Sequence, residues 1–560
     1  MPETRLAAVL PDSELSGGDS VKPTRGNPLL TARVHIDALI GAPARYAKAV
    51  WWCLCGKRQR ARSILEPLLG MSAHAYQLWV ARAEEPRKRS AEKRVMGEKI
   101  VAIVEVPQGA VGLEQTLRSL GDEGIAAVML RSGDGAGLGA PMAGSLAELA
   151  GAIDWDQRPW LLPICAGDVL AAGAGALYAA AAARSQARIV YADDDLLDER
   201  GKRIAPHFKP DWNSELYRHF DYMSGACIVQ AQKDEMLSVE GSADWRRDLI
   251  SGIACEHTPE HVHHVLHHRR GRPAPKVPVT PATLDKSLPP VTVVVPTRNR
   301  VDLLKTCLSG LDAAKYPNLK VIVVDNGSDD PAALAYLDGL NGRNFSVLRH
   351  DGPFNFAAIN NRAVRQAVAP MLCFLNNDIE VIGPDWLPAM VMQAMRDDVG
   401  AVGAQLLYPD GRTQHAGVVL GVKGGTAHAH RLLKPSEEGY FWRHQLPQFA
   451  SAVTAACMVV QRDRFLAVGG FDEENFAVAF NDVDLCMRLN RRGWQTLYEP
   501  RAQLVHHESV SRGSDRDPVG ARRLAGEMAA LNRRWGTDRY VDPYHHPNLS
   551  RFSERFVVAL

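Results

Sequence analysis

The strongest constraint on the fold comes from two short apolar runs, VTVVVP at residues 291–296 and VIVVD at residues 321–325. Continuous runs rich in β-branched residues are typical of strands buried on both faces of a sheet. Between them, residues 301–312 space their leucines as on the buried face of a helix. A strand, a helix and a strand in succession form a βαβ unit, which predicts a parallel sheet and an α/β fold.

The same alternation occurs earlier in the chain in a less regular form. Strands are expected at 99–106, 125–130, 159–164 and 187–191, with a helix at 112–120. After the first βαβ unit, strands are expected at 345–348, 371–375, 399–407 and 494–497, and helices at 357–369 and 386–395. The pattern therefore predicts two related α/β units in tandem.

Composition suggests where these units begin and end. Proline is frequent from residue 273 to residue 290, which predicts a stiff, extended linker. Residues 1–30 are rich in Pro, Gly, Ser and Asp and are expected to be disordered, whereas residues 38–81 are expected to be helical. We therefore expect a disordered and helical region at 1–95, a first α/β unit at 96–272, a linker at 273–289, and a second unit with a C-terminal extension at 290–560.

Charge and cysteine content exclude several functional classes. The 560 residues include 65 Lys and Arg against 64 Asp and Glu, a net charge of +1, which argues against a protein that coats nucleic acid. Nine scattered cysteines without a CxxC pair fit a reducing compartment rather than a disulfide framework. No segment approaches the roughly 18 apolar residues of a membrane-spanning helix. We therefore expect a cytoplasmic protein.

One helical segment leaves a membrane alternative open. Trp51 and Trp52 are adjacent, and a basic cluster, KRQRAR, follows at 57–62. Tryptophan beside basic residues can seat a helix in a membrane interface. The simpler interpretation is a helix packed on the next domain with a solvated basic end. A peripheral contact with the inner face of the plasma membrane is therefore the second hypothesis for its location.

Polar residues follow three of the strands expected in the second unit. They are PTRNR at 296–300, DNGSDD at 325–330 and NND at 376–378. Any one of them is explained by a turn or a helix cap, because Asn, Asp, Gly and Ser dominate turns. Ligands of open α/β sheets, however, bind beyond the carboxyl ends of the strands. Three such clusters at one edge predict a single crevice.

The crevice lacks a glycine cradle for phosphate groups. Residues 133–139 are rich in glycine but do not spell GxGxxG, and the chain contains no GxxxxGK. A divalent ion can replace the cradle, because Mg²⁺ needs only one or two carboxylates besides the phosphates of a substrate. Asp378 is the expected ligand, with Asn376 as a weaker neighbour acting directly or through water.

Two further segments carry candidate reactive groups. In NDVD at 481–484, Asn481 suits a helix cap and the acids suit the first turn, but a carboxylate there can also act as a general base. In LVHHESVSRG at 504–513, His506 or His507 is a candidate metal ligand and Arg512 a candidate phosphate ligand. An ordinary polar loop explains the second segment equally well.

Together these segments resemble the bacterial family 2 glycosyltransferases, which have a GT-A fold. Further matching segments are FNFAAINNRAV at 354–364, AVGAQLLYPDGRTQHAGVVLG at 401–421 and FNDVDLCMRL at 480–489. The resemblance runs in unbroken order from about residue 290 to residue 549. It is most similar to the branch that builds rhamnose-containing O-antigen and other surface polysaccharides.

The resemblance implies an activity and its cofactor. It implies an inverting hexosyl or rhamnosyl transfer from a nucleoside diphosphate donor, dTDP-rhamnose or a UDP-sugar, with Mg²⁺ or Mn²⁺. The acceptor would be a growing, lipid-linked glycan. No covalent intermediate on the enzyme is required.

Individual residues take roles from the same resemblance. Asp482 matches the catalytic base and Asp484 its acidic neighbour, while Asp378 and His506 match the metal site, with His507 as the rival of His506. Asn376 replaces the first aspartate of the family's DxD motif. The residues implied to contact the donor are Pro296, Thr297, Asn299, Asp325, Asn376 and Arg512, of which Asp325 would bind the nucleobase.

The first unit resembles the family in a degenerate form. IVYADDD at 189–195, PHFKPDW at 206–212 and the segment 261–270 match, but PICAGD at 163–168 retains only Asp168 of the metal motif. The nucleobase-binding aspartate expected near residues 131–133 is missing. We therefore expect this unit to be non-catalytic, and the histidine-rich residues 255–268 to be a strand and loop rather than a metal site.

Two other functional classes compete with an enzyme of this family. The alternative is a non-catalytic glycan-binding or scaffold protein of a polysaccharide assembly complex, but acids at all three positions Asp325, Asp378 and Asp482 disfavour it. A sugar nucleotidyltransferase would require a glycine-rich, lysine-bearing loop, and residues 296–300 do not form one.

Overall fold

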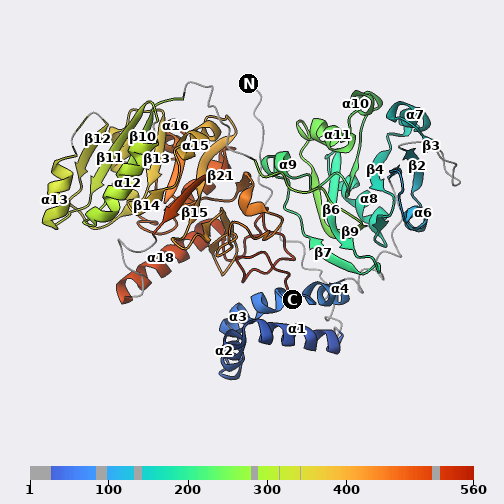
Figure 1. The fold of residues 1–560 in the computed structure, drawn as a ribbon, viewed down its shortest axis with the longest axis horizontal. Helices are drawn as coiled ribbons and strands as arrows, with labels where there is room; N and C mark the ends of the chain where they lie inside the picture. Colours follow the sequence, from blue (N-terminus) through green and yellow to red (C-terminus); the bar gives the residue numbers. More distant parts are fainter. Residues whose placement is uncertain are drawn as a thin grey trace.

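The computed structural model describes residues 27–83, 98–131, 142–278, 288–314, 316–340, 342, 344–507 and 517–560. Within these ranges the chain forms a small helical region and two α/β units (Figure 1). The expectations for residues 1–26, for the glycine-rich segment 133–139 and for Arg512 lie outside the described residues.

Within residues 27–83, the described part of the helical region forms four helices that precede the first unit. They are α1 (Pro28–Gly41), α2 (Pro43–Leu54), α3 (Arg58–Gly70) and α4 (Ala75–Ala83). Asn27 caps α1 by accepting hydrogen bonds from the backbone of the first turn. In α4, the rings of Tyr76 and Trp79 stack on each other and both pack against Phe208 of the first unit. This aromatic contact anchors the helical region.

The first unit is built on a mixed sheet. Its strands, in chain order, are β1 (Ile100–Val106), β2 (Ala126–Arg131), β3 (Met142–Ala143), β4 (Trp160–Cys165), β5 (Val169–Leu170), β6 (Ile189–Leu197), β7 (Arg203–His207), β8 (Cys227–Val229) and β9 (Glu260–Arg269). The helices between them are α6 (Leu113–Asp122), α7 (Leu146–Ala152), α8 (Ala174–Arg184), α9 (Ser214–His219), α10 (Lys233–Ser238) and α11 (Trp245–Ala254). In space the strands run β3-β2-β1-β4-β8-β6-β9-β5.

The second unit repeats this plan. The strands of its large sheet are β10 (Val291–Thr297), β11 (Leu319–Asp325), β12 (Phe345–Arg349), β13 (Met371–Leu375), β14 (Ile379–Val381), β15 (Val399–Leu407), β16 (Thr413–His415), β19 (Gln448–Ala450), β20 (Cys457–Gln461) and β21 (Gln495–His506). A separate hairpin is formed by β17 (Val418–Leu420) and β18 (Thr426–His428). Its helices are α12 (Val301–Ala313), α13 (Pro331–Asp338), α14 (Phe356–Gln366), α15 (Trp386–Ala394), α16 (Arg462–Ala467), α17 (Asn481–Arg491) and α18 (Pro518–Trp535).

Strand order confirms that the two units share one architecture. The large sheet of the second unit runs β12-β11-β10-β13-β20-β15-β21-β14, which matches the first sheet strand for strand and in the direction of each pairing. The expected α/β fold is therefore present twice. The sheets are mixed rather than parallel, because β20 and β14 run antiparallel to their neighbours. These two strands are short, and the sequence around them does not show the strand–helix–strand pattern from which the direction of a strand is predicted.

The buried apolar runs explain the central strands. In β10, Val291, Val293 and Val295 contribute to one core cluster with residues of α12, whereas Val294 contributes to the cluster that contains residues of α14. Each face of the strand is thus covered by a helical layer. A continuous apolar run is what such a strand requires.

Two expected boundaries in the second unit are wrong, and both concern the site. The strand expected at 494–497 continues to His506, because a register shift opposite residues 404–405 accommodates Pro500 without ending the pairing. His506 is therefore the last residue of a strand rather than part of a loop. Asn481 is the first residue of α17 and not its cap, a position held by Phe480.

The two units are joined by buried polar contacts. The side chain of Asn213 in the first unit donates to the carbonyl of Phe449 in the second at 2.9 Å. Glu215 forms an ion pair with Arg396 at 2.6 Å, and this carboxylate is almost fully buried. The segment after α18 joins them as well. The carbonyl of Pro543 accepts from the backbone of Asp211, His546 contacts Asp193, and the Ser550 hydroxyl donates to Glu66 of α3.

Among the described residues, no helix combines the length and the apolar composition needed to cross a bilayer.

Candidate active site

A cavity of about 740 Å³ opens at the carboxyl ends of β10, β11 and β13. This is the edge of the sheet where the sequence predicts a crevice. The residues that line it are Pro296, Thr297, Arg298, Asn299, Arg300, Asn326, Phe354, Phe356, Ile359, Asn376, Asn377, Asp378, Thr454, Ala455, Ala456, Val478, Asn481, Asp482 and His506. Segments far apart in the chain thus meet in one polar cavity.

Asp378 and His506 face each other in the wall of this cavity. The residue after Asp378, Ile379, pairs with His506 in the antiparallel ladder of β14 and β21, which brings the two side chains together. Their Oδ1 and Nε2 atoms are 3.1 Å apart. Asn376 lies beside them, with its Nδ2 atom 3.4 Å from the same imidazole nitrogen.

The hydrogen bonds of His506 fit a metal site. Its Nδ1 atom lies 2.7 Å from the side-chain oxygen of Gln414, which can only accept, so Nδ1 carries a proton. In the neutral ring Nε2 then offers a lone pair toward Oδ1 of Asp378, a buried atom with no hydrogen-bond partner among the described residues. Two lone pairs at this distance require a proton or a cation between them. A carboxylate and an imidazole held this way are able to bind a divalent cation.

The same pair affects the titration of Asp378. Burial alone would raise the pKa of this carboxyl, but a proton between Asp378 and Nε2 of His506 would supply a hydrogen bond and a positive charge that outweigh burial and hold the pKa of Asp378 below its usual value. Asp378 is therefore a carboxylate at neutral pH.

Asp482 lies in the first turn of α17 and borders the cavity. Its Oδ2 atom accepts from the backbone of Ala455 at 3.1 Å, and its Oδ1 atom accepts from the backbone of Val483 at 2.8 Å. Phe480, two residues before Asp482, has a left-handed backbone conformation with a φ of 62°. Such strain in a non-glycine residue is common at functional sites. The turn thus presents a partly exposed carboxylate in a fixed orientation.

Asp484, the second acid of this turn, does not line the cavity. It is fully buried, and its carboxylate binds Arg488 and Arg534 at 2.8 Å each and the indole of Trp535 at 3.0 Å. Arg534 and Trp535 belong to α18, so Asp484 ties the two helices together.

The loop after β10 is held in an unusual conformation. Asn299 and Arg300 both have left-handed backbones, with φ of 53° and 45°. The Asn299 side chain accepts from the backbone of Asp329 and Asp330, which joins this loop to the one after β11. Thr297 lies deeper and accepts from the side chain of Asn377 at 3.1 Å.

Asp325 is at the end of β11 but does not line the cavity. Its buried carboxylate accepts from the Ser328 side chain and backbone and pairs with Arg349. The neighbouring Asn326 lines the cavity instead, with its amide donating to the carbonyls of His350 and Gly352.

Several lining residues were not singled out from the sequence. Arg298 and Arg300 stand inside the PTRNR segment, whose two arginines were the available signal. Phe354 and Phe356 flank Asn355 and gave no chemical signal, because an aromatic residue in a sequence is more often part of a core. Their position in the wall follows only from the fold.

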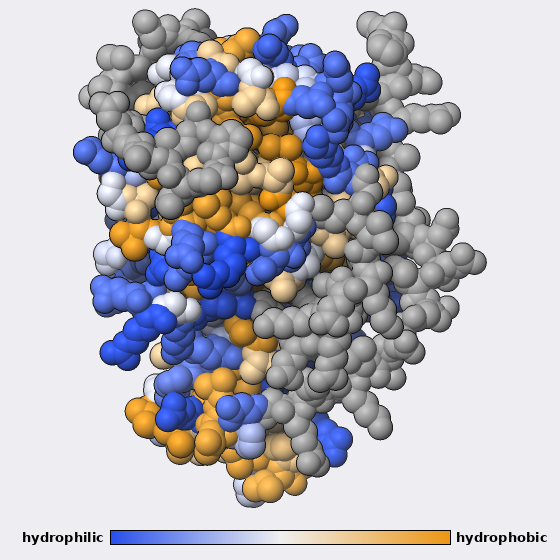
Figure 2. All heavy atoms as spheres, turned by 90° about the vertical axis from the view of Figure 1, so that its right-hand side faces the viewer, coloured by the Kyte–Doolittle hydropathy of each residue, from blue (hydrophilic) through white to orange (hydrophobic). Residues whose placement is uncertain are grey.

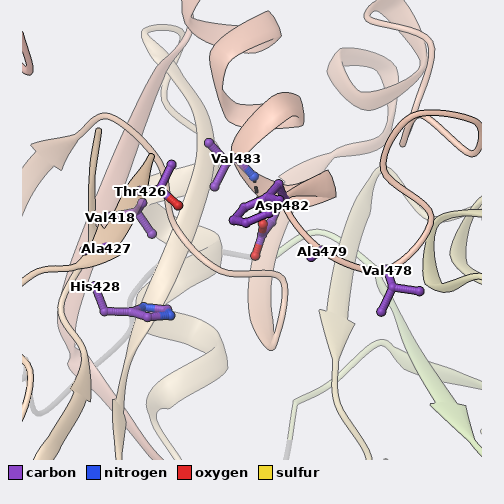
Figure 3. Close-up of a pocket in the computed structure, with 9 residues that line it drawn as sticks. Val418, Thr426, Ala427, His428, Val478, Ala479, Asp482 and Val483 are labelled. Atoms are coloured by element: carbon purple, nitrogen blue, oxygen red, sulfur yellow. Dashed lines mark hydrogen bonds between the residues drawn. The ribbon is translucent and has the colours of Figure 1, made fainter. Parts of the chain in front are cut away.

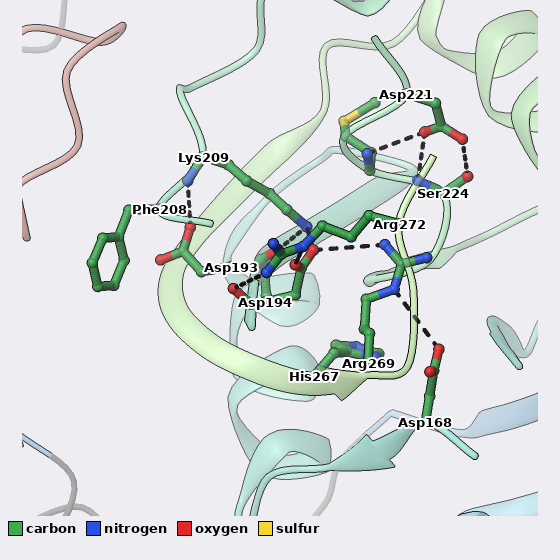
Figure 4. A network of polar contacts seen from close by, with 12 residues as sticks. Asp168, Asp193, Asp194, Phe208, Lys209, Asp221, Ser224, His267, Arg269 and Arg272 are labelled. Atoms are coloured by element: carbon green, nitrogen blue, oxygen red, sulfur yellow. Dashed lines mark hydrogen bonds and ion pairs between the residues drawn. The ribbon is translucent and has the colours of Figure 1, made fainter. Parts of the chain in front are cut away.

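The corresponding edge of the first unit is filled by the chain's own cations (Figure 4). Asp168 precedes β5 as Asp378 precedes β14, and burial raises its pKa. Val169 pairs with His268 as Ile379 pairs with His506, but His268 turns away to bind Asp195 at 2.7 Å. The next residue, Arg269, approaches Asp168 and Asp194 at 3.7 Å.

Two further features close this edge. Lys209 is fully buried and binds Asp194 at 2.8 Å, and Arg272 binds the same carboxylate. Arg269 packs so tightly on Gly225 that a Cβ atom there would clash with the guanidinium group. Arg246, the second residue of α11, stands where α17 has Asp482 and binds Glu105 at 3.1 Å.

The histidine-rich strand β9 forms part of a proton-sharing network. His261, His263 and His546 come within 4.8 Å of one another. Both ring nitrogens of His261 bind carboxylates, of Asp193 and Asp211. His546 accepts from the backbone of Asn548 at Nδ1, so its Nε2 atom carries the proton that faces Asp193. A metal ion bound by His261 and His546 would therefore have to displace the protons that these rings share with the carboxylates.

The chain is similar in sequence to proteins of one known family. A family model described as glycosyl transferase family 2 matches residues 292–458. The O-antigen biosynthesis protein RfbC of Myxococcus xanthus is 34% identical over 412 residues, 66% of this chain and 32% of that protein. The N-acetylglucosaminyl-diphospho-decaprenol L-rhamnosyltransferase of Mycobacterium tuberculosis is 27% identical over 241 residues, 38% of this chain and 74% of that protein.

The mannosyltransferase PcManGT of Pyrobaculum calidifontis, in complex with GDP-Man and Mn²⁺, aligns with a TM-score of 0.34 at 19% identity, covering 47% of this chain and 68% of that one. Two curated relatives match about two thirds of this chain. The match covers less than half of the length of each of these relatives.

Proposed function

We propose that the second unit, whose residues 292–458 match the model of glycosyl transferase family 2, transfers a sugar from a nucleoside diphosphate donor to a growing surface polysaccharide. The observation that carries the proposal is the cavity that Asp482 lines together with the pair of Asp378 and His506. It combines a candidate base with a candidate cation site. Similarity to an O-antigen biosynthesis protein and to a rhamnosyltransferase supports the class of product.

Asp378 and His506 would hold a divalent cation, with Asn376 beside them. The ion would neutralise the charge that develops on the leaving diphosphate. The donor set contains an imidazole nitrogen, which suits Mn²⁺ better than Mg²⁺ because Mg²⁺ prefers oxygen ligands. His507 is the weaker candidate, since it forms an exposed ion pair with Glu380.

Asp482 is the proposed general base. It would accept the proton of an acceptor hydroxyl while the oxygen of that hydroxyl forms a bond to the anomeric carbon of the donor. At the same time, the bond between the anomeric carbon and the oxygen of the diphosphate breaks. The leaving diphosphate departs on the opposite face, so the configuration inverts and no enzyme-bound intermediate is formed. Asp484 would act only by positioning this turn, because its carboxylate is occupied by Arg488, Arg534 and Trp535.

The donor would lie along the loops after β10 and β11. Pro296, Thr297 and Asn299 shape this wall, and Arg298 and Arg300 add positive charge for the diphosphate. Asn326 borders the cavity where Asp325 does not. We therefore propose that Asp325 contributes to nucleobase binding by fixing this loop through Ser328 and Arg349.

The helical region offers a peripheral membrane contact. Large apolar side chains of α1 and α2 are exposed, among them Ile36, Ile40, Trp51 and Leu54. Figure 2, seen from the side of the first unit, shows apolar residues gathered at the lower end, where Figure 1 places these helices. Residues 28–62 contain seven Lys and Arg against one Asp. An exposed apolar face with this charge suits an anionic bilayer and would bring the enzyme to a lipid-linked acceptor at the inner face of the plasma membrane.

The enzymatic proposal is tested by measuring nucleoside diphosphate release from dTDP-rhamnose and from a set of UDP-sugars, with Mn²⁺, with Mg²⁺ and with EDTA. Turnover of one donor that stops with EDTA supports it. Absence of turnover with every donor and both ions, in a folded preparation that binds none of them, would favour the glycan-binding scaffold instead. The membrane contact is tested separately by sedimentation with phosphatidylglycerol vesicles, which a Trp51→Glu variant should not bind.

A further inference from the structure

The loop that leads to Asp482 is held by a carboxylate from another helix. Glu527 belongs to α18 and is buried, with 6% of its surface exposed. Its Oε1 atom accepts from the backbone N–H of Val478 at 2.8 Å, and its Oε2 atom accepts from the backbone N–H of Ala479 at 3.2 Å. An ionised carboxylate can accept at both oxygens, since neither carries a proton. Both oxygens of this buried group therefore bind the backbone of one loop.

The residues that follow this loop present the candidate base. Phe480 comes next in the chain with a left-handed backbone, and Asp482 is the second residue of α17. The carbonyl of Val478 accepts from the side chain of Asn481 at 2.9 Å. A strained residue persists only where the surrounding structure fixes it. The hydrogen bonds to Glu527 and Asn481 supply this restraint on the N-terminal side of the strained residue.

The helix α18 also holds the turn from its other side. Asp484 binds Arg534 and Trp535 at the C-terminal end of the same helix. The chain is thus tied to α18 both before and after Asp482, first through Glu527 and then through Asp484. The position of the base therefore depends on this helix, although no residue of α18 lines the cavity of the site.

The loop held by Glu527 borders two cavities. Val478 and Asp482 line the large cavity of the site, and they also line a smaller one with a volume of about 310 Å³. Figure 3 shows the smaller cavity, with Ala479 between these two residues along the loop. A general base must lie within hydrogen-bond distance of the proton that it accepts. A displacement of this loop would therefore move the base away from its substrate.

The first unit lacks this arrangement. Asp244 precedes α11 as Phe480 precedes α17, but it has a φ of −122° rather than a left-handed backbone. Residues 270–278, the described residues that directly follow β9, form no helix that could take the place of α18. The unit with Arg246 at the position of the base thus has neither the strained turn nor the helix that holds it. This difference associates the restraint with the base rather than with the shared fold.

We propose that Glu527 is a positioning residue for the transfer reaction, and that its carboxylate holds the turn in the conformation in which Asp482 accepts the proton of the acceptor hydroxyl. This inference rests on the proposed function and adds to it a residue outside the cavity. Glu527 contacts neither substrate. It acts on the base through the backbone of Val478 and Ala479.

The test combines Glu527→Gln with Asp482→Asn. Glu527→Gln keeps the size of the side chain but turns an NH₂ group toward one of the two backbone N–H groups. We expect kcat to fall about 10- to 100-fold, as when a reacting group is displaced by about 1 Å, while donor binding with Mn²⁺ stays within twofold. When added to Asp482→Asn, the same change should lower kcat by less than twofold, because the group that it positions is already absent. Nucleoside diphosphate release is measured with the donor that the wild-type protein turns over and with octyl α-L-rhamnoside or octyl β-N-acetylglucosaminide as the acceptor.

Two controls separate positioning from a general loss of stability. Glu474→Gln makes the same chemical change at an exposed residue shortly before the loop and should keep kcat within twofold. Hydrogen exchange followed by mass spectrometry should be faster in Glu527→Gln for the peptide that contains residues 478–484, and unchanged in the sheet of the second unit. Should Glu527→Gln not fold, Glu527→Asp keeps the buried charge with a shorter reach, and the same results are expected of it.

The outcomes distinguish this inference from the proposed function. Turnover that the wild-type protein shows and Glu527→Gln retains contradicts the inference alone. An equal loss of kcat with Asp482 and with Asn at that position, or unchanged hydrogen exchange at residues 478–484, would also overturn it. Absence of wild-type turnover with every donor contradicts the proposed function itself, and the positioning role with it.

Discussion

The two α/β units have the same strand order but satisfy the charges at the carboxyl ends of their strands in different ways. In the second unit, Asp378 faces an imidazole with no other partner for its buried oxygen among the described residues, and a large cavity opens above it. In the first unit, Arg269, Lys209 and Arg272 surround Asp194, and Arg269 also approaches Asp168. The comparison indicates that the sheet depends on its apolar core, whereas ligand binding depends on whether the chain supplies the compensating charge itself.

The largest difference should appear at the position of the base. Asp482→Asn keeps the shape of the turn but removes the proton acceptor, so we expect transfer to fall by about 10²–10⁴-fold with donor binding retained. Arg246→Ala, at the matching position of the first unit, should leave turnover within twofold. Steady-state rates of both variants at saturating donor check this. Near-normal turnover of Asp482→Asn would remove it from the mechanism.

The second difference concerns stability rather than rate. Asp194→Asn leaves three cations without their buried carboxylate, and breaking such a network costs about 3–5 kcal/mol. Asp378→Asn should cost far less, because its carboxylate faces a single imidazole rather than three permanent cations. Thermal unfolding of both variants at pH 7 measures the difference. The positive neighbours hold the pKa of Asp194 far below its usual value, so its contribution is fully present above pH 3.8, the ordinary value, and falls only in stronger acid.

The third comparison separates a working cation site from a closed one. Asp378→Ala should weaken Mn²⁺-dependent donor binding by about 10- to 100-fold, as expected when a group that supports a metal is lost. Asp168→Ala should leave donor binding and turnover unchanged in whatever fraction remains folded. Calorimetric titration of the donor with and without Mn²⁺ provides the measurement. A product that lost one of two sugars in Asp168→Ala would instead establish activity in the first unit.

The smallest difference is expected within the histidine pair. His506→Ala removes a proposed ligand and should weaken Mn²⁺ binding about tenfold or more. His507→Ala should have little effect, because an exposed ion pair such as that with Glu380 contributes about 0–1 kcal/mol. Electron paramagnetic resonance of bound Mn²⁺ distinguishes the two variants. The reverse ranking would assign the site to His507.

Much of the fold behind this comparison could be predicted from the sequence, because strands and helices leave local patterns of apolar residues. The apolar runs at 291–296 and 321–325 revealed the βαβ unit and its polar edge. The antiparallel strands and the full length of β21 were missed, since their pairing is set by partners far along the chain. His506 reaches Asp378 only because β21 continues past Pro500 to pair with β14.

The roles of the two acids in α17 could not be separated from the sequence. Both belong to one helical turn, and the choice between them depends on α18, whose Arg534 and Trp535 bind Asp484. Likewise, Arg246 and Arg269 are unremarkable basic residues in the sequence. Only the register of β9 and the start of α11 place them at the edge where the second unit keeps Asp482 and the histidine.

The segment after α18 has a consequence for the order in which the protein matures. Pro543 contacts Asp211, His546 contacts Asp193, and Ser550 contacts Glu66. In each pair, the ribosome synthesises the second residue several hundred residues before the first. A ribosome releases residues from the N-terminus onward, so the contact of His546 with Asp193 in the first unit cannot form until residue 546 has emerged. During that interval, Asp193 and the ring of Phe208 lack the contacts that His546 later supplies. The contacts that complete the first unit are therefore among the last that the growing chain can form.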